Sequence, residues 1–105
     1  MVKISAVIIT FNEEEHLDKC LISLKDIADE IVVIDSYSTD NTQKICDQHN
    51  VKFIQQEFLG YIEQKNFAIS KASHDYILSL DGDEALSDEL KKSILATKEN
   101  WIYDG

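Results

Sequence analysis

The sequence has no proline, only three glycines and two cysteines, and half as many basic as acidic residues. No low-complexity segment, internal repeat or linker composition interrupts its 105 residues. This length and a hydrophobic content of 44% suffice for one modest core, so we expect a single domain over residues 1–105. A net charge of -10 without a run of basic residues repels nucleic acid, which is therefore not expected as a partner.

Several functional signatures are also absent. Neither glycine-rich phosphate-binding pattern occurs, and no nucleophile motif of a Ser-His-Asp catalytic triad is recognised. Cys20 and Cys46 fall at apolar positions of expected helices, which favours buried thiols over a disulfide or a metal site and is typical of a cytoplasmic protein. The first ten residues are too short for a membrane span and lack a cleavage pattern, so neither a transmembrane segment nor a signal peptide is expected.

Four apolar runs alternate with four amphipathic stretches along the chain. The expected strands cover residues 4–10, 31–34, 51–54 and 76–80, and helices are expected after Asn12, over about 40–49 and 60–72, and from Ser87 onward. This alternation predicts an α/β fold: a Rossmann-like, mostly parallel sheet with helices on both faces. Ligands bind beyond the carboxyl ends of such strands, so the polar loops that follow the strands should share one edge.

The spacing of apolar residues predicts the buried face of each helix. In the first helix, which Asn12 is expected to cap, the buried residues should be Leu17, Cys20, Leu21 and Leu24. In the third helix they should be Ile62, Ile69 and Ala72.

The loop after the fourth expected strand carries the strongest chemical signal, Asp81-Gly82-Asp83-Glu84. Clustered carboxylates repel one another unless a positive group shares the site. Mg²⁺ or Mn²⁺ fits, because these cations prefer oxygen ligands and retain water or substrate phosphates. Gly82 leaves room for the backbone to approach a ligand. The pattern indicates either a metal that carries a phosphorylated substrate or a solvated acidic turn.

The other loops offer groups to the same ligand, each with a structural alternative. Asp35 can accept a hydrogen bond from a base imide or a ribose hydroxyl, whereas Asp40 is better explained as a helix cap. Phe11 can contact the face of a planar base or pack in the core. Lys65 can meet a diphosphate or remain solvated on its helix.

Four segments together resemble the N-terminal half of a family 2 glycosyltransferase of GT-A fold. They are residues 7–13, 32–42, 64–68 and 80–84, in matching order and spacing, and they span nearly the whole chain. The resemblance implies a nucleotide-diphospho-sugar donor, usually a UDP-sugar, and inverting transfer to a hydroxyl acceptor. The sequence is similar to bacterial members of lipopolysaccharide-core type, which implies a glycan or lipid-linked acceptor and a cytoplasmic location, peripheral at the inner membrane.

The resemblance also assigns roles at the donor. Thr10, Phe11 and Glu13 would line the nucleoside pocket, Asp35 would contact uracil, and Lys65 would lie near the diphosphate.

Asp81 and Asp83 would form the Asp-x-Asp motif of the family. Asp83 would be the direct ligand of Mg²⁺ or Mn²⁺, and Asp81 would lie nearer the ribose or the outer shell of the metal. The family usually has glycine where Tyr37 stands, so Tyr37 is expected to crowd the base pocket or alter the turn.

Family members continue well beyond the metal motif, into acceptor-binding strands and a general base. We therefore expect a donor-binding part that transfers poorly alone. Its uncovered sheet edge and helix faces favour a homodimer. The alternatives are a non-catalytic nucleotide-binding or dimerising fragment and a haloacid-dehalogenase-like phosphatase. In that phosphatase family the Asp-x-Asp motif normally follows the first strand.

Overall fold

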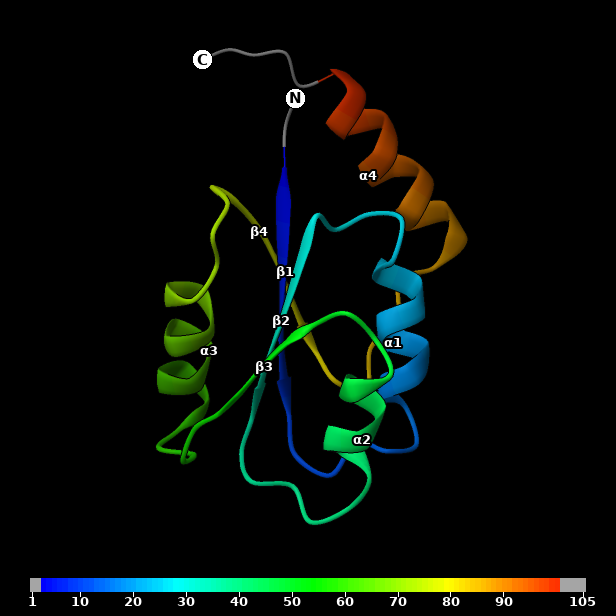
Figure 1. Ribbon diagram of the computed structural model, residues 1–105. Helices are drawn as coiled ribbons and strands as arrows, with labels where there is room; N and C mark the ends of the chain where they lie inside the picture. The colour runs from blue at the N-terminus through cyan, green and yellow to red at the C-terminus, as the bar shows by residue number, and fades with distance from the viewer. Residues whose placement is uncertain (1–2, 101–105) are drawn as a thin grey trace.

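The computed structural model describes residues 3–100, in which four strands alternate with four helices (Figure 1). The strands are β1 (Ile4–Thr10), β2 (Glu30–Asp35), β3 (Lys52–Gln55) and β4 (Tyr76–Asp81), and the helices are α1 (Leu17–Leu24), α2 (Thr42–Asp47), α3 (Tyr61–Ser70) and α4 (Asp88–Asn100). All neighbouring strands are parallel, in the order β3-β2-β1-β4. Helix α3 covers one face of the sheet and α1 and α2 the other, as predicted (Figure 1).

An apolar layer on each face of the sheet forms the core. Beneath α1, the side chains of Leu17, Cys20, Leu21 and Leu24 are buried as predicted and pack against Ile8. On the opposite face, a smaller cluster joins α3 to the sheet, and its buried members are Val7, Val32, Ile34 and Ala68. These layers hold β1 and β2 in the centre, so the loops that leave their carboxyl ends start from fixed positions.

Helix α3 buries a different face from the one that its isoleucines predict. Ile62 and Ile69 are 72% and 42% exposed, whereas Gln64 and Ala68 are buried. The small side chain of Ala68 lets the helix approach the sheet closely. Gln64 tolerates burial because its Nε2 donates a hydrogen bond of 3.0 Å to Ser36 Oγ.

Strand β4 lies at the edge of the sheet, and most of its side chains are not buried. Tyr76 and Ile77 are exposed and only Leu80 is buried, because β4 pairs with β1 alone. Self-association through this edge stays a prediction. Across residues 3–100, no helix combines the length and the apolar character needed to cross a membrane.

The loop after β1 is fastened to the loop after β2. Asn12 Oδ1 accepts a hydrogen bond of 2.8 Å from the backbone N–H of Thr39, and the Asn12 N–H donates to Ser38 Oγ at 2.8 Å. The prediction that Asn12 caps the first helix is therefore wrong. Its φ of +51° turns the chain away from cap geometry, and α1 begins later, at Leu17.

Asp40 has a structural role at the start of α2, although the next residue, Asn41, occupies the N-cap position. Its Oδ1 accepts a hydrogen bond of 2.9 Å from the N–H of Thr42, the first residue of α2. Its Oδ2 accepts one of 3.2 Å from the N–H of Glu14. Asp40 thus ties the start of α2 to the loop before α1. Ser87 similarly opens α4, because its Oγ accepts a hydrogen bond of 3.1 Å from Leu90 N–H.

Candidate functional site

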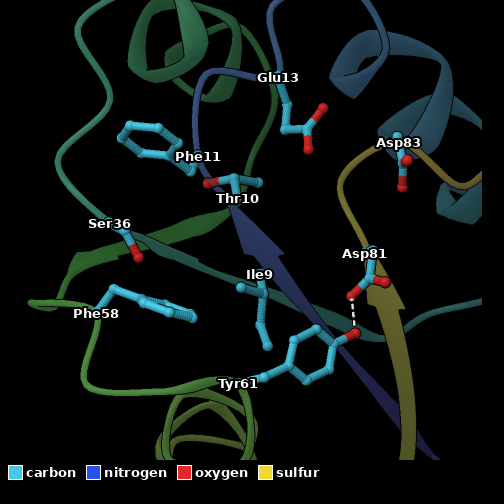
Figure 2. Close-up of a pocket in the computed structure, with 9 residues that line it drawn as sticks. All are labelled: Ile9, Thr10, Phe11, Glu13, Ser36, Phe58, Tyr61, Asp81 and Asp83. Atoms are coloured by element: carbon cyan, nitrogen blue, oxygen red, sulfur yellow. Dashed lines mark hydrogen bonds between the residues drawn. The ribbon is translucent and has the colours of Figure 1, made fainter.

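A pocket of about 470 Å³ opens at the carboxyl ends of the strands (Figure 2). Its lining residues are Ile9, Thr10, Phe11, Glu13, Ser36, Phe58, Tyr61, Asp81 and Asp83. All four loops that follow the strands contribute, as expected where parallel strands end at one edge. The structure therefore brings together Thr10, Phe11, Glu13, Asp81 and Asp83 from the residues that the sequence singled out, while Asp35 and Lys65 lie outside the lining.

The acidic side of the pocket is built by the turn that follows β4. The N–H of Gly82 donates a hydrogen bond of 3.0 Å to the carbonyl of Ile9, and Glu84 Oε1 accepts one of 2.7 Å from Asp81 N–H. A Cβ on residue 82 would lie 2.8 Å from Glu13 Cγ, closer than such atoms approach. Glycine at this position thus lets the acidic turn pack against the loop after β1.

The pKa of Glu13 is affected by burial and by the neighbouring carboxylates of the pocket. Burial, followed by the proximity of Asp83, raises the pKa of the Glu13 carboxyl above its ordinary value. A diphosphate brought to this side would meet like charges. A positive group beside an anionic ligand would offset this repulsion.

Tyr61 connects the acidic turn to α3. Its hydroxyl donates a hydrogen bond of 2.6 Å to Asp81 Oδ1 (Figure 2). This bond is the main reason why the pKa of the Tyr61 phenol lies above its ordinary value. The Lys65 ammonium lies 5.0 Å from the centroid of the Tyr61 ring, so the lysine adjoins the pocket through the tyrosine.

Asp35 lies buried behind the pocket wall. Its Oδ1 accepts hydrogen bonds from Thr10 Oγ1 at 2.7 Å and Ser38 Oγ at 2.5 Å, and its Oδ2 accepts one from Ser38 N–H at 2.8 Å. Asp35 therefore fixes the loop after β2 to the end of β1. The next residue, Ser36, faces the pocket in its place. The predicted contact of Asp35 with uracil stays a prediction.

Tyr37 keeps the backbone that a glycine would adopt. Its φ is +56°, in the left-handed region, and its side chain is 57% exposed. The side chain is not among those that line the pocket. The Tyr37 side chain therefore does not crowd the pocket, while its backbone has a conformation that favours glycine.

Phe58 and Tyr61 are pocket residues that sequence reasoning missed. Phe58 lies in the loop between β3 and α3, and Tyr61 is the first residue of α3; neither belongs to a recognised motif. The available signal was a pair of aromatic residues around the start of an expected helix at the ligand-binding edge. Exposure of large apolar side chains needs a reason there, and Phe58 is 55% and Tyr61 48% exposed.

The carboxylates of the acidic turn are better suited to a cation that also binds ligand phosphates than to a cation held by protein side chains alone. Among the side chains that the structure describes, no group of three His, Cys, Asp or Glu residues is arranged to hold a metal. Mg²⁺ and Mn²⁺ commonly bind one or two carboxylates together with phosphate oxygens and water. Asp81 and Asp83 can supply that partial set at one side of the pocket.

Two curated relatives show strong sequence similarity. An uncharacterized glycosyltransferase of Rickettsia felis is 48% identical over 94 residues, which cover 90% of this chain and 33% of that protein. The lipopolysaccharide core biosynthesis glycosyltransferase LpsC of Rhizobium meliloti is 37% identical over 94 residues, which cover 85% of this chain and 34% of LpsC. The chain thus spans about a third of the length of these relatives.

Solved structures show the same fold. Residues 1–349 of S. aureus TarS superpose with a TM-score of 0.75 at 30% identity over 90% of this chain and 32% of that one. The structure of TarS 1–349 in complex with UDP superposes with a TM-score of 0.70 at 25% identity, over 90% of this chain and 31% of the TarS chain. A third structure is a Mycobacterium tuberculosis glucosyl-3-phosphoglycerate synthase in complex with Mn²⁺ and UDP. It superposes with a TM-score of 0.69 at 21% identity, over 80% of this chain and 36% of that chain, and supports the fold alone.

The family model for glycosyl transferase family 2 matches residues 5–101. This match spans most of the chain and confirms the resemblance that the four loop segments predict, including the GT-A fold class. It also removes the haloacid-dehalogenase-like phosphatase alternative. The chain therefore belongs to glycosyl transferase family 2.

Proposed function

We propose that this chain is a donor-binding domain and that its pocket binds a UDP-sugar. The observation that carries the proposal is the division of the pocket into two chemically different sides (Figure 2). Phe11, Ser36 and Phe58 lie on one side, and Asp81 and Asp83 lie on the other. A nucleotide-sugar has a matching division, with a planar base at one end and a charged diphosphate at the other. The UDP bound to S. aureus TarS, at 25% identity, also supports the proposal.

The aromatic side would hold the nucleoside. Phe11 is 56% exposed and can cover the face of a planar base, while Thr10 and Glu13 line the space toward the ribose. Asp35 would contribute to uracil recognition indirectly, by fixing the position of the loop after β2 that faces the base. Lys65, beside the Tyr61 ring, would meet the diphosphate.

The acidic side would hold Mg²⁺ or Mn²⁺ together with the diphosphate. Asp83 is exposed and would be the direct ligand, whereas one oxygen of Asp81 is already engaged by Tyr61 and would act from the outer shell or toward the ribose. When bound, the cation would offset the negative charge that develops on the departing diphosphate.

We propose inverting transfer to a bacterial envelope glycan or lipid-linked acceptor as the activity of the whole protein. An acceptor hydroxyl would form the new C–O bond at the anomeric carbon as the bond to the β-phosphate breaks. UDP would leave with the electron pair, and the hydroxyl proton would pass to a general base on the acceptor side. LpsC, named for lipopolysaccharide core biosynthesis, supports this acceptor class. A cytoplasmic location, peripheral at the inner membrane, is proposed with it; the buried free thiols Cys20 and Cys46 suit a reducing compartment.

Calorimetric titration of the chain with UDP tests the donor site. We expect weak binding in EDTA and an affinity higher by about tenfold or more in Mn²⁺, a difference of about 1.4 kcal/mol or more. ADP carries the same diphosphate on another base and serves as the control, which should bind more weakly than UDP. Equal UDP affinity in EDTA and Mn²⁺ would remove the bridging metal from the proposal. Absence of UDP binding in both would remove the donor site itself.

A further inference from the structure

Tyr61 contacts two oppositely charged side chains at the pocket, those of Asp81 and Lys65. It is the first residue of α3, and Lys65 lies one helical turn later on the same face of that helix. The Tyr61 hydroxyl binds Asp81 Oδ1 at 2.6 Å, and the Tyr61 ring lies 5.0 Å from Lys65 Nζ. One aromatic side chain thus joins the start of α3 to the end of β4, through residues that lie 20 positions apart in the sequence.

The two contacts have different physical effects. The hydrogen bond to Asp81 involves a charged acceptor, so it is stronger than one between neutral groups and restricts rotation of the carboxylate. It uses one oxygen of Asp81 and leaves Oδ2 for another partner. The cation–π contact restrains a flexible lysine side chain, which otherwise loses considerable rotamer freedom when it binds a ligand.

We propose that Tyr61 is a positioning residue that orders the diphosphate end of the pocket, its hydroxyl orienting Asp81 and its ring placing Lys65. The proposal rests on the proposed donor site. Tyr61 contributes without bonding to the diphosphate or its cation. Charges that are ordered before the ligand arrives increase affinity, because less conformational freedom is lost on binding.

Two substitutions separate the hydroxyl from the ring. Tyr61→Phe removes the hydrogen bond to Asp81 and keeps a ring beside Lys65, whereas Tyr61→Leu removes both. In calorimetry with UDP and Mn²⁺, we expect about a tenfold loss of affinity for Tyr61→Phe and a larger loss for Tyr61→Leu. Tyr37→Phe, at an exposed tyrosine outside the pocket lining, is the matched control and should bind as the unaltered chain does. Thermal melts should show that Tyr61→Phe remains folded.

A double-substitution comparison supplies a readout that a merely structural role would not move. If the Tyr61 hydroxyl acts by orienting Asp81, the loss of UDP affinity caused by Tyr61→Phe should become much smaller in a chain that already carries Asp81→Asn.

The outcomes distinguish the positioning role of Tyr61 from the proposed donor site on which it rests. Failure of the unaltered chain to bind UDP overturns the donor site and the role of Tyr61 with it. If the unaltered chain binds UDP and Tyr61→Phe binds equally or more tightly, only the positioning role is overturned. A loss of affinity from Tyr61→Phe that Asp81→Asn leaves unchanged also overturns that role, because the hydroxyl would then act independently of Asp81.

Discussion

Asp83→Asn is expected to abolish most of the gain in UDP affinity that Mn²⁺ or Mg²⁺ provides. A neutral amide is a weaker ligand for a hard cation than a carboxylate, and Asp83 lies exposed in the pocket beside Asp81. We expect the affinity in Mn²⁺ to fall on the order of 10- to 100-fold, close to the value in EDTA. Calorimetry with UDP in Mn²⁺ and in EDTA measures this difference.

The control for Asp83→Asn removes the same charge elsewhere. Asp75 is exposed just before β4 begins, at the other end of that strand, so Asp75→Asn should retain the full effect of the metal. Both variants should keep the melting temperature of the unaltered chain, because substitutions at exposed positions have small effects on stability. If Asp83→Asn retained the metal effect and Asp81→Asn lost it, the direct ligand would be Asp81.

Asp35→Ala is expected to cause the largest loss of stability among the site variants. Asp35 is fully buried, and its removal leaves the hydroxyl of Thr10 and the N–H of Ser38 without their acceptor. Unsatisfied buried polar groups cost about 1–3 kcal/mol each, so we expect a total loss of about 3 kcal/mol. Urea denaturation followed by circular dichroism measures the free energy of unfolding. A loss below about 1 kcal/mol would mean that this network contributes little.

Asp40→Ala is the matched comparison for Asp35→Ala. Asp40 accepts a hydrogen bond from the N–H of Thr42 at the start of α2, and loss of a side-chain acceptor at a helix start costs about 1 kcal/mol. At a temperature where both variants are folded, Asp35→Ala should weaken UDP binding more, because the loop that carries Ser36 loses its anchor. If Asp40→Ala weakened UDP binding more, the base contact would belong to the loop segment that Asp40 holds.

The sequence predicts the sheet and its ligand-binding edge well, for a physical reason. Consecutive β-branched residues such as Val7, Ile8 and Ile9 are typical of a strand covered on both faces, and β1 lies in the interior of the sheet. Once the strands are parallel, their following loops must meet at one edge. The meeting of Thr10 with Asp81 in one pocket follows from that topology.

The predictions from sequence that are wrong concern places where a tertiary contact outweighs a local sequence pattern. Ile62 and Ile69 predict the buried face of α3, but a hydrogen bond to Ser36 permits Gln64 to be buried instead. Asn12 has the composition of a helix cap, but its side chain is used to join two loops. Such contacts link residues that are far apart in the chain, so no local spacing predicts them.

The most direct test of the donor pocket is paramagnetic broadening by Mn²⁺ in the amide NMR spectrum of the chain with UDP. A bound Mn²⁺ broadens signals according to distance, so it locates the cation even on a chain of net charge -10. We predict that broadening in the presence of UDP centres on residues 81–84, extends to residues 10–13, and spares residues 73–76 at the opposite end of β4. Broadening that is spread over the acidic surface, or is unchanged when UDP is omitted, would contradict a shared metal and diphosphate site in this pocket.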